Sequence, residues 1–252
     1  MSLLKKIIRP AYYWVESRYY LFLGFLFPSK ITDSKRIPII INNRNRITYL
    51  LQLIDSLEKK GYTNIHIIDN NSSYPPLLDY YKRCPYHVYR LERNVGYLAL
   101  WKTDIYKKFI KDYYVYTDSD VVPINDCPDD FMEFFLATLK KFRSAEKVGF
   151  SLMIDDLPDT YLKKEKVIEW EKRYYEKKKN HLLYIAPIDT TFALYRPFIK
   201  KEVIHSHLTF RTAFPYSARH LPWYVDSSNL GEEEKYYIEN ASTSTHWTSL
   251  NK

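Results

Sequence analysis

Glycine is scarce in this chain, with 5 residues among 252. No G-x-G-x-x-G string and no G-x-x-x-x-G-K-S or G-x-x-x-x-G-K-T string occurs, so neither a dinucleotide-binding turn nor a P-loop can be assigned. Cysteine is scarcer still: Cys84 and Cys127 are too few for a four-ligand zinc site or a disulfide framework. Two reduced cysteines are typical of a cytosolic protein, and we expect a cytoplasmic one.

No apolar run near the N-terminus is long enough to cross a membrane. The stretch Leu21–Phe27 has seven residues, whereas a spanning helix needs about 20. Aromatic and charged residues interrupt the stretch and no small-residue cleavage site follows, so we do not expect a secretory signal.

Positive charge is concentrated at one end of the sequence. The net charge is +8, and residues 1–36 contribute +5 of it through seven basic residues against Glu16 and Asp33. A nucleic-acid-binding protein is expected to have a basic face on its folded body, so nucleic acid is disfavoured as a partner. The mixture of basic and aromatic residues in segment 1–28 indicates peripheral contact with the inner face of the cytoplasmic membrane. A helix packed on the domain or on a partner protein is the alternative.

Short apolar runs alternate with helical patterns from residue 37 to residue 123. The predicted strands are 38–41, 64–69, 87–91 and 113–117, and the predicted helices follow Thr48, Pro75 and Leu98. This alternation predicts an α/β fold with a mostly parallel central sheet and helices on both faces. The second half is less regular, with a charged helix expected over 163–180, and we expect residues 37–252 to form one domain.

Each predicted strand is followed by polar residues. These clusters are Asn42–Arg46, Asp69–Ser73, Arg93–Gly96 and Asp118–Asp120. Ligands of open α/β sheets bind outside the carboxyl ends of the strands, so the four clusters are expected to converge on one crevice.

The string Tyr114–Pro123 contains the most informative of these clusters. An apolar strand ends there in Asp118 and Asp120, one residue apart. Two carboxylates this close repel each other unless a positive group lies beside them. Oxygen ligands suit Mg²⁺ or Mn²⁺, which can also bind a diphosphate. A turn in which one of the two aspartates caps a helix is the alternative.

Together these motifs resemble the GT-A fold glycosyltransferases, in particular the family 2 nucleotide-sugar enzymes. The matching strings are Pro38–Arg46, Ile67–Ser73, Arg93-Asn94-Val-Gly96 and Tyr116–Pro123, in the family's order. The resemblance implies a nucleotide-binding half over 37–123 and an acceptor-binding half over 124–252. It implies nucleotide contacts from Asn43, Arg44, Asp69, Asn94, Lys102 and Asp118, and Mn²⁺ or Mg²⁺ held by Asp118, Asp120 and His246.

The chain departs from the family pattern at two places. Asn43 and Arg44 stand where threonine and tyrosine are usual, and the acidic Glu-Asp pair that supplies the general base has no clean match. By position, Glu234 or Glu233 is the best candidate for the base, followed by Asp226; Asp189 is a further candidate. On the acceptor side we expect Asp189 together with Trp223 and Tyr224, whose aromatic faces suit the apolar faces of sugars.

The resemblance implies a metal-dependent hexosyltransferase that moves a sugar from a nucleotide-diphosphate donor, a UDP-sugar in the favoured case. The acceptor is expected to be a glycan or a lipid-linked molecule of surface polysaccharide synthesis. One alternative is a sugar-nucleotidyltransferase, which usually needs a glycine-rich first turn that Asn42–Arg46 does not have. The other alternative is a non-catalytic basic protein that binds nucleic acid.

Overall fold

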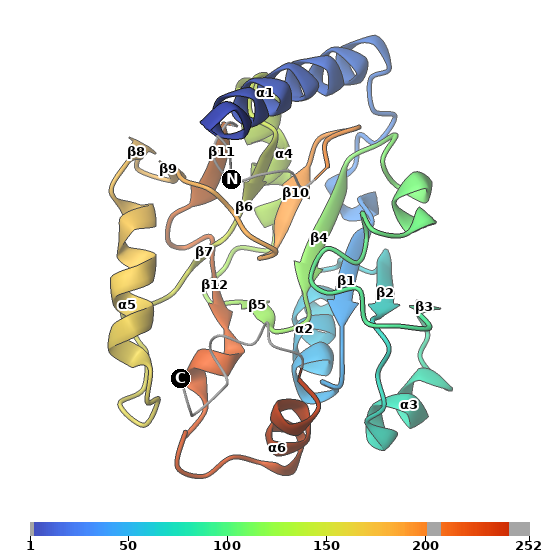
Figure 1. Cartoon of the computed structure of the whole chain (residues 1–252), viewed down its shortest axis with the longest axis vertical. Helices are drawn as coiled ribbons and strands as arrows, with labels where there is room; N and C mark the ends of the chain where they lie inside the picture. The colour runs from blue at the N-terminus through green and yellow to red at the C-terminus, as the bar shows by residue number, and fades with distance from the viewer. Residues whose placement is uncertain (1–2, 201–207, 242–252) are drawn as a thin grey trace.

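A nine-stranded sheet with the strand order β3-β2-β1-β4-β10-β6-β11-β9-β8 forms the centre of the computed structural model (Figure 1). The structure describes residues 3–200 and 208–241, and side chains from residue 14 onward within these ranges. The strands are β1 (Ile39–Asn43), β2 (Ile65–Asp69), β3 (His87–Arg90), β4 (Tyr114–Asp118), β5 (Val121–Pro123), β6 (Lys147–Gly149), β7 (Ser151–Leu152), β8 (Lys178–Asn180), β9 (Leu183–Ile185), β10 (Ala193–Tyr195), β11 (Thr209–Thr212) and β12 (Ser217–His220).

Helices cover both faces of this sheet. They are α1 (Leu3–Leu26), α2 (Thr48–Lys59), α3 (Pro75–Tyr81), α4 (Phe131–Lys141), α5 (Lys164–Lys172) and α6 (Glu232–Glu239), with 3-10 turns η1 (Ser34–Arg36), η2 (Asp104–Lys108), η3 (Arg173–Tyr175) and η4 (Leu221–Tyr224). In β1, Ile39 and Ile41 pack with side chains of α2 and α4, whereas Ile40 packs on the other face with η2 and α1. A strand that is apolar on both sides is typical of a buried parallel sheet.

The four strands of the first half lie parallel to one another. β1 lies between β2 and β4, and the register pairs Asn43 with Asp69 and Asn42 with Asp118. The polar residues that follow the strands are therefore brought to one edge, as the sequence predicts. The predicted α/β fold is confirmed.

The second half of the sheet is mixed. β10 runs antiparallel between β4 and β6, β11 is parallel to β6, and β9 and β8 complete the sheet in antiparallel fashion. A separate three-stranded sheet, β5-β12-β7, lies beside the β4 tip. The predicted parallel arrangement thus holds for β3-β2-β1-β4, whereas antiparallel pairs dominate beyond β4.

Two predicted helices are wrong in their extent. The helix expected from Leu98 to Lys111 is a series of turns ending in η2, where the Thr103 hydroxyl donates to the carbonyls of Ala99 and Leu100 and so competes with a regular helix. The helix expected over 163–180 ends at Lys172, and residues Lys178–Asn180 form β8 instead.

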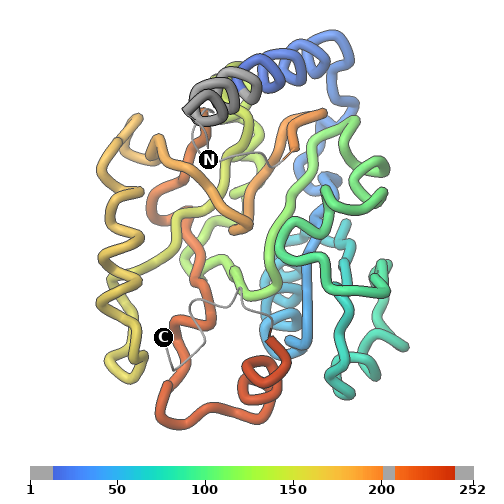
Figure 2. The backbone as a smooth tube through the Cα atoms, viewed as in Figure 1, coloured from blue at the N-terminus to red at the C-terminus, as the bar shows by residue number. Residues whose placement is uncertain are grey.

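α1 packs at the end of the sheet opposite Asp118 (Figure 1). The Ser17 hydroxyl bonds to Glu146 just before β6, and the rings of Phe27 and Phe198 lie 6.3 Å apart beyond the end of β10. None of the described helices is long and apolar enough to cross a membrane. At the other end of the molecule, Figure 2 shows α6 returning next to the start of α2.

Candidate functional site

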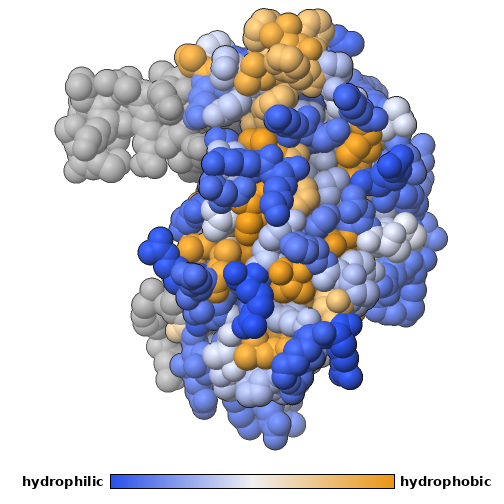
Figure 3. Space-filling model, turned by 90° about the vertical axis from the view of Figure 1, so that its right-hand side faces the viewer, coloured by the Kyte–Doolittle hydropathy of each residue, from blue (hydrophilic) through white to orange (hydrophobic). Residues whose placement is uncertain are grey.

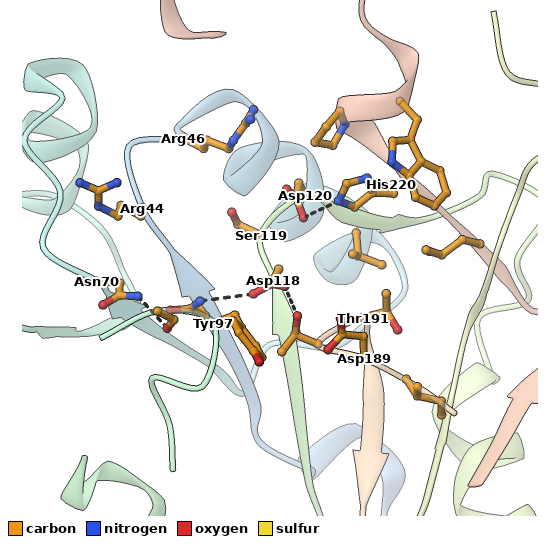
Figure 4. Close-up of a pocket in the computed structure, with 18 of the residues that line it drawn as sticks. Arg44, Arg46, Asn70, Tyr97, Asp118, Ser119, Asp120, Asp189, Thr191 and His220 are labelled. Carbon is orange, nitrogen blue, oxygen red and sulfur yellow. Dashed lines mark hydrogen bonds and ion pairs between the residues drawn. The ribbon is translucent and has the colours of Figure 1, made fainter. Parts of the chain in front are cut away.

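A cavity of about 570 Å³ opens where the parallel strands end (Figure 4). Three groups of its lining residues mark its two ends and its middle. Residues at the tips of β1 and β2 and in the turn after β3 form the strand-tip end, comprising Asn42, Arg44, Asn70, Asn94, Gly96 and Tyr97. Asp118, Ser119 and Asp120 lie between the two ends. The opposite wall, which we call the α5 end, comprises Trp170, Glu171, Tyr174, Pro187, Asp189 and Arg211.

Asp118 is held by hydrogen bonds at the end of β4. Its Oδ1 accepts from Asn42 Nδ2 at 3.2 Å, its Oδ2 accepts from the Thr190 hydroxyl, and its backbone N–H donates to Thr190 O at 3.1 Å. Burial, together with the charge of Asp120, raises the pKa of Asp118 to about 7. The carboxylate is therefore fixed in place but costly to ionise without a cation nearby.

Asp120 lies two residues further along the chain, and one of its carboxylate oxygens has no hydrogen-bond partner among the described residues. This oxygen, Oδ1, is buried, and the nearest cationic candidate is His220 Nε2 at 3.7 Å. Burial lowers the pKa of His220, so the ring is neutral at pH 7, and its Nδ1 also has no partner in the described part of the chain. Figure 4 shows His220 pointing at Asp120 from β12.

These side chains suit a divalent cation in their chemistry. Two carboxylates and a neutral imidazole are ordinary ligands of Mn²⁺, and an unsatisfied buried carboxylate oxygen needs a positive partner. Within residues 3–200 and 208–241, no group of three or more His, Cys, Asp or Glu side chains is arranged to hold a metal ion. The described residues therefore offer Asp118, Asp120 and His220 as candidate ligands rather than a completed site. The predicted ligand His246 lies outside the described residues.

The strand-tip end is built from amide side chains that bond to the backbone of the turn after β3. Asn70 is 2% exposed, donates from Nδ2 to Gly96 O and accepts at Oδ1 from Val95 N, both at 2.9 Å. Gly96 has φ +82°, a left-handed conformation that favours glycine. Asn94 Oδ1 accepts from the Gly96 N–H at 2.9 Å. The result is a rigid edge on which a planar ring or ribose could lie beside Tyr97.

Three residues predicted to contact a nucleotide do not line the cavity. Asn43 is buried between Tyr81 and Ser119, and Asp69 is buried between the Ser72 N–H and Arg90. Lys102 Nζ donates to Val95 O at 2.7 Å. Asp69 therefore shapes a turn, which is a common role of aspartate after a strand. Arg44, Asn94 and Asp118 do line the cavity.

Of the four carboxylates predicted as candidates for the catalytic base, Glu234, Glu233 and Asp226 are absent from the cavity wall. Glu234 forms a buried two-point ion pair with Arg46, with oxygen–nitrogen distances of 2.6 and 3.0 Å. Glu233 accepts from the Thr48 N–H at 3.1 Å and thus caps α2 from another helix. Asp226 accepts from Ser228 in a surface turn. The geometry therefore favours a different carboxylate, the exposed Asp189, which does line the cavity.

Of the three residues expected on the acceptor side, two line the cavity and one does not. Asp189 and the buried Trp223 line the cavity. Tyr224 does not, because its hydroxyl donates to Asp156 at 2.5 Å. The prediction of Tyr224 as an acceptor contact is not supported by this placement.

Several lining residues were not predicted from the sequence, including Arg46, Tyr97, His220 and Tyr237. His220 lies three residues before Trp223 in the sequence. It comes close to Asp120 because β12 pairs with β5, which places His220 opposite Val121. Arg46 stacks on Tyr237 at 3.7 Å from its ring centroid. Neither contact has a local signal in the sequence.

No protein-family model matches this chain, and no curated protein matches it. Solved structures similar in fold include GalNAc-T7 with UDP, GalNAc and Mn²⁺, at 14% identity and a TM-score of 0.46 over 71% of this chain and 43% of that chain. Glucosyl-3-phosphoglycerate synthase from Mycobacterium tuberculosis, in complex with phosphoglyceric acid, matches at 14% identity and a TM-score of 0.41 over 69% and 61% of the two chains.

A third similar structure is a cytidylyltransferase from Leptospira borgpetersenii serovar Hardjo-bovis (strain JB197), at 11% identity and a TM-score of 0.35 over 56% of this chain and 72% of that one. This chain spans less than two thirds of the length of the first two structures. In fold it resembles the first two structures, which are GT-A fold glycosyltransferases. With TM-scores below 0.5, these matches carry no argument about substrates or the roles of residues.

Proposed function

We propose that this protein is a glycosyltransferase that moves a sugar from a nucleoside-diphosphate donor to an acceptor hydroxyl. The observation that carries the proposal is the pair Asp118 and Asp120 at the tip of the parallel strand β4, in a cavity with two chemically different ends. A diphosphate with a divalent cation is the ligand that compensates two such carboxylates.

The donor fits the strand-tip end. Its hydrogen-bonding side chains, Asn70 and Arg44, suit a nucleoside and its phosphates, and Arg44 Nε is buried without a partner in the described residues. The favoured donor is a UDP-sugar, by the sequence resemblance. Asn42 and Thr190 keep Asp118 oriented.

Asp118 and Asp120 would hold Mn²⁺ or Mg²⁺ together with the predicted ligand His246, and the neutral His220 lies beside Asp120. When bound, such a cation neutralises the charge that grows on the leaving diphosphate. Asp189 is the acidic group we assign to the acceptor side, where it would accept the proton of the attacking hydroxyl. It follows Ile188, whose carbonyl accepts from the buried Lys147 Nζ at 2.8 Å, so its backbone is fixed.

The test is to measure nucleotide binding and products on the full chain. UDP is expected to bind with Mn²⁺ and to lose affinity when the metal is chelated. Incubation with a panel of UDP-sugars is expected to release UDP slowly even without an acceptor. Release of pyrophosphate from UTP and a sugar phosphate would instead identify a sugar-nucleotidyltransferase. Binding of UDP with no dependence on metal would contradict the proposed role of Asp118 and Asp120.

We also propose that α1 attaches the protein to the cytoplasmic face of an anionic membrane. Of twelve large apolar side chains exposed in the described residues, seven lie between residues 14 and 27: Trp14, Val15, Tyr19, Phe22, Phe25, Leu26 and Phe27. Figure 3 shows part of this apolar surface at the top of the molecule. Arg18 and Lys30 beside it are exposed and complement anionic lipid. The cavity is at the other end of β4, which favours a glycan over a lipid-linked acceptor.

Vesicle sedimentation tests this attachment. The double variant Phe22→Ser/Phe25→Ser is expected to lose most binding to phosphatidylglycerol vesicles, while Leu162→Ser, at a similarly exposed position, keeps it. Equal binding of both variants would contradict the proposal. UDP binding is expected to be unchanged in all of them.

A further inference from the structure

The cavity extends well beyond the residues that the donor needs. Past Asp118 and Asp120 it reaches the α5 end, where Trp170 and Tyr174 form part of the wall with Pro187 and Arg211. Figure 1 shows α5 along the left edge of the molecule, on the side away from β2 and α3. This wall lies opposite the strand-tip end, so a second ligand has room there while a nucleotide is bound.

The rings of this wall are fixed by guanidinium groups. Arg173 Cζ lies 3.5 Å from the ring centroid of Trp170 and 4.8 Å from that of Tyr174. Arg211 Cζ lies 4.0 Å from the Tyr174 centroid as well. Stacked guanidinium and aromatic groups attract one another, which limits the motion of the rings. The result is a pre-organised platform in which Trp170 is the exposed ring and Tyr174 is a partly buried residue of the same wall.

Arg211 is itself held firmly. It is 2% exposed, bonds Glu171 at 2.7 Å and donates from Nε to Pro187 O at 2.8 Å. Through Pro187 the platform is tied to the loop that carries Asp189. The platform and Asp189 therefore keep a constant relation to each other, as a binding site requires.

Trp170 is the unusual member of the wall. It leaves 48% of its surface exposed while it lines the cavity, and aromatic side chains are a common component of the walls of ligand pockets. A second observation points to a ligand that carries hydroxyl groups. Thr191, 9% exposed, lines the same cavity with a buried Oγ1 that has no hydrogen-bond partner among the described residues. Figure 4 shows Thr191 next to Asp189.

We infer that the α5 end binds the acceptor as a pyranose ring, stacked on the exposed indole of Trp170. The C–H face of the ring covers the exposed indole, and the ring hydroxyls bond to Asp189 and Thr191. This inference rests on the proposed function, because it names the class of acceptor. A nucleobase could also stack on the platform, but amide donors and acceptors to read its edge are found at the strand-tip end.

Ligand-observed NMR on the full chain with UDP and Mn²⁺ tests the inference. The probes are the methyl pyranosides of glucose, galactose and N-acetylglucosamine, with glycerol as a polyol without a ring. At least one pyranoside is expected to receive saturation at its ring C–H protons. Trp170→Ala is expected to weaken its binding about fivefold to tenfold, as removal of a central aromatic contact does, while Trp170→Phe stays within about twofold of wild type.

The matched control is Phe214→Ala, which removes an exposed aromatic ring from the turn between β11 and β12, at 59% exposure. It is expected to leave pyranoside binding unchanged. UDP affinity, measured on the same samples, is expected to be the same in wild type and Trp170→Ala. Absence of saturation for every pyranoside, an equal signal from glycerol, or a parallel loss of UDP affinity in Trp170→Ala would overturn the inference. Failure of the wild type to bind UDP would instead overturn the proposed function.

Discussion

The strand-tip end and the α5 end of the cavity are stiffened in different ways. At the strand-tip end, the neutral amides Asn70 and Asn94 bond to backbone groups of the turn after β3. At the α5 end, two buried cations, Arg211 and Lys147, donate to the carbonyls of Pro187 and Ile188. A neutral hydrogen bond contributes about 1 kcal/mol, whereas a buried charge that loses its partner costs several. The α5 end therefore depends more strongly on single residues.

The carboxylates between the two ends are expected to give the largest effect on activity. Asp120→Asn removes the negative charge that faces the proposed cation, so metal-dependent UDP release should fall on the order of a thousandfold. Asp126→Asn, in the exposed loop after β5, is the matched control and should release UDP at the wild-type rate. Metal-dependent turnover in Asp120→Asn within tenfold of wild type would exclude Asp120 as a ligand.

The next largest effect is expected on stability at the α5 end. Glu171→Gln leaves the Arg211 charge buried without its partner, since the two side chains are 5% and 3% exposed, and should lower the free energy of unfolding by about 3 kcal/mol. The partly exposed pair Arg219–Asp156 is the control, and Asp156→Asn should cost about 0.5 kcal/mol. Urea unfolding followed by circular dichroism measures both. Equal losses would show that the α5 end has no special dependence on buried charge.

A smaller loss of stability is expected at the strand-tip end. Asn70→Ala removes two hydrogen bonds and leaves the Val95 N–H and Gly96 O without their partner, which should cost about 2 kcal/mol. Because the turn at Gly96 would then loosen, UDP affinity should fall as well. Asn125→Ala, at an exposed position, is the control. If Asn70→Ala is as destabilising as Glu171→Gln, the contrast between the two ends disappears.

The part of the fold that the sequence predicts well is the part made by local patterns. Runs such as Ile39–Ile41 and Tyr114–Thr117 are short, apolar and followed by polar residues, so their order predicts a parallel sheet whose ends meet. The convergence of Asn94, Asp118 and Asp120 on one cavity follows from that topology alone. The turns after Leu98 were missed because apolar spacing suits a helix there, while Thr103 bonds the preceding carbonyls.

The rest of the site depends on contacts between residues far apart in sequence. Glu234 looks like a free acid in the sequence, but its partner Arg46 lies 188 positions away. His220 reaches Asp120 only through the pairing of β12 with β5. No periodicity or spacing encodes such partners, so the candidate base and the candidate metal ligands could not be separated from structural carboxylates by sequence reasoning.

The smallest expected effect comes from a comparison of Arg44 and Lys102, two basic residues that were both predicted from the sequence to contact the nucleotide. Arg44 lines the cavity, whereas Lys102 Nζ is occupied by Val95 O outside it. Arg44→Ala should weaken UDP binding about tenfold through the loss of a phosphate contact, and Lys102→Ala should change it less than about twofold. Isothermal titration with UDP and Mn²⁺ measures both. Salt screens the attraction between an exposed lysine and a distant anion, so Lys102 should contribute little to UDP affinity. A strong effect of Lys102→Ala would therefore mean that the turn at Gly96 moves toward the phosphates when UDP binds.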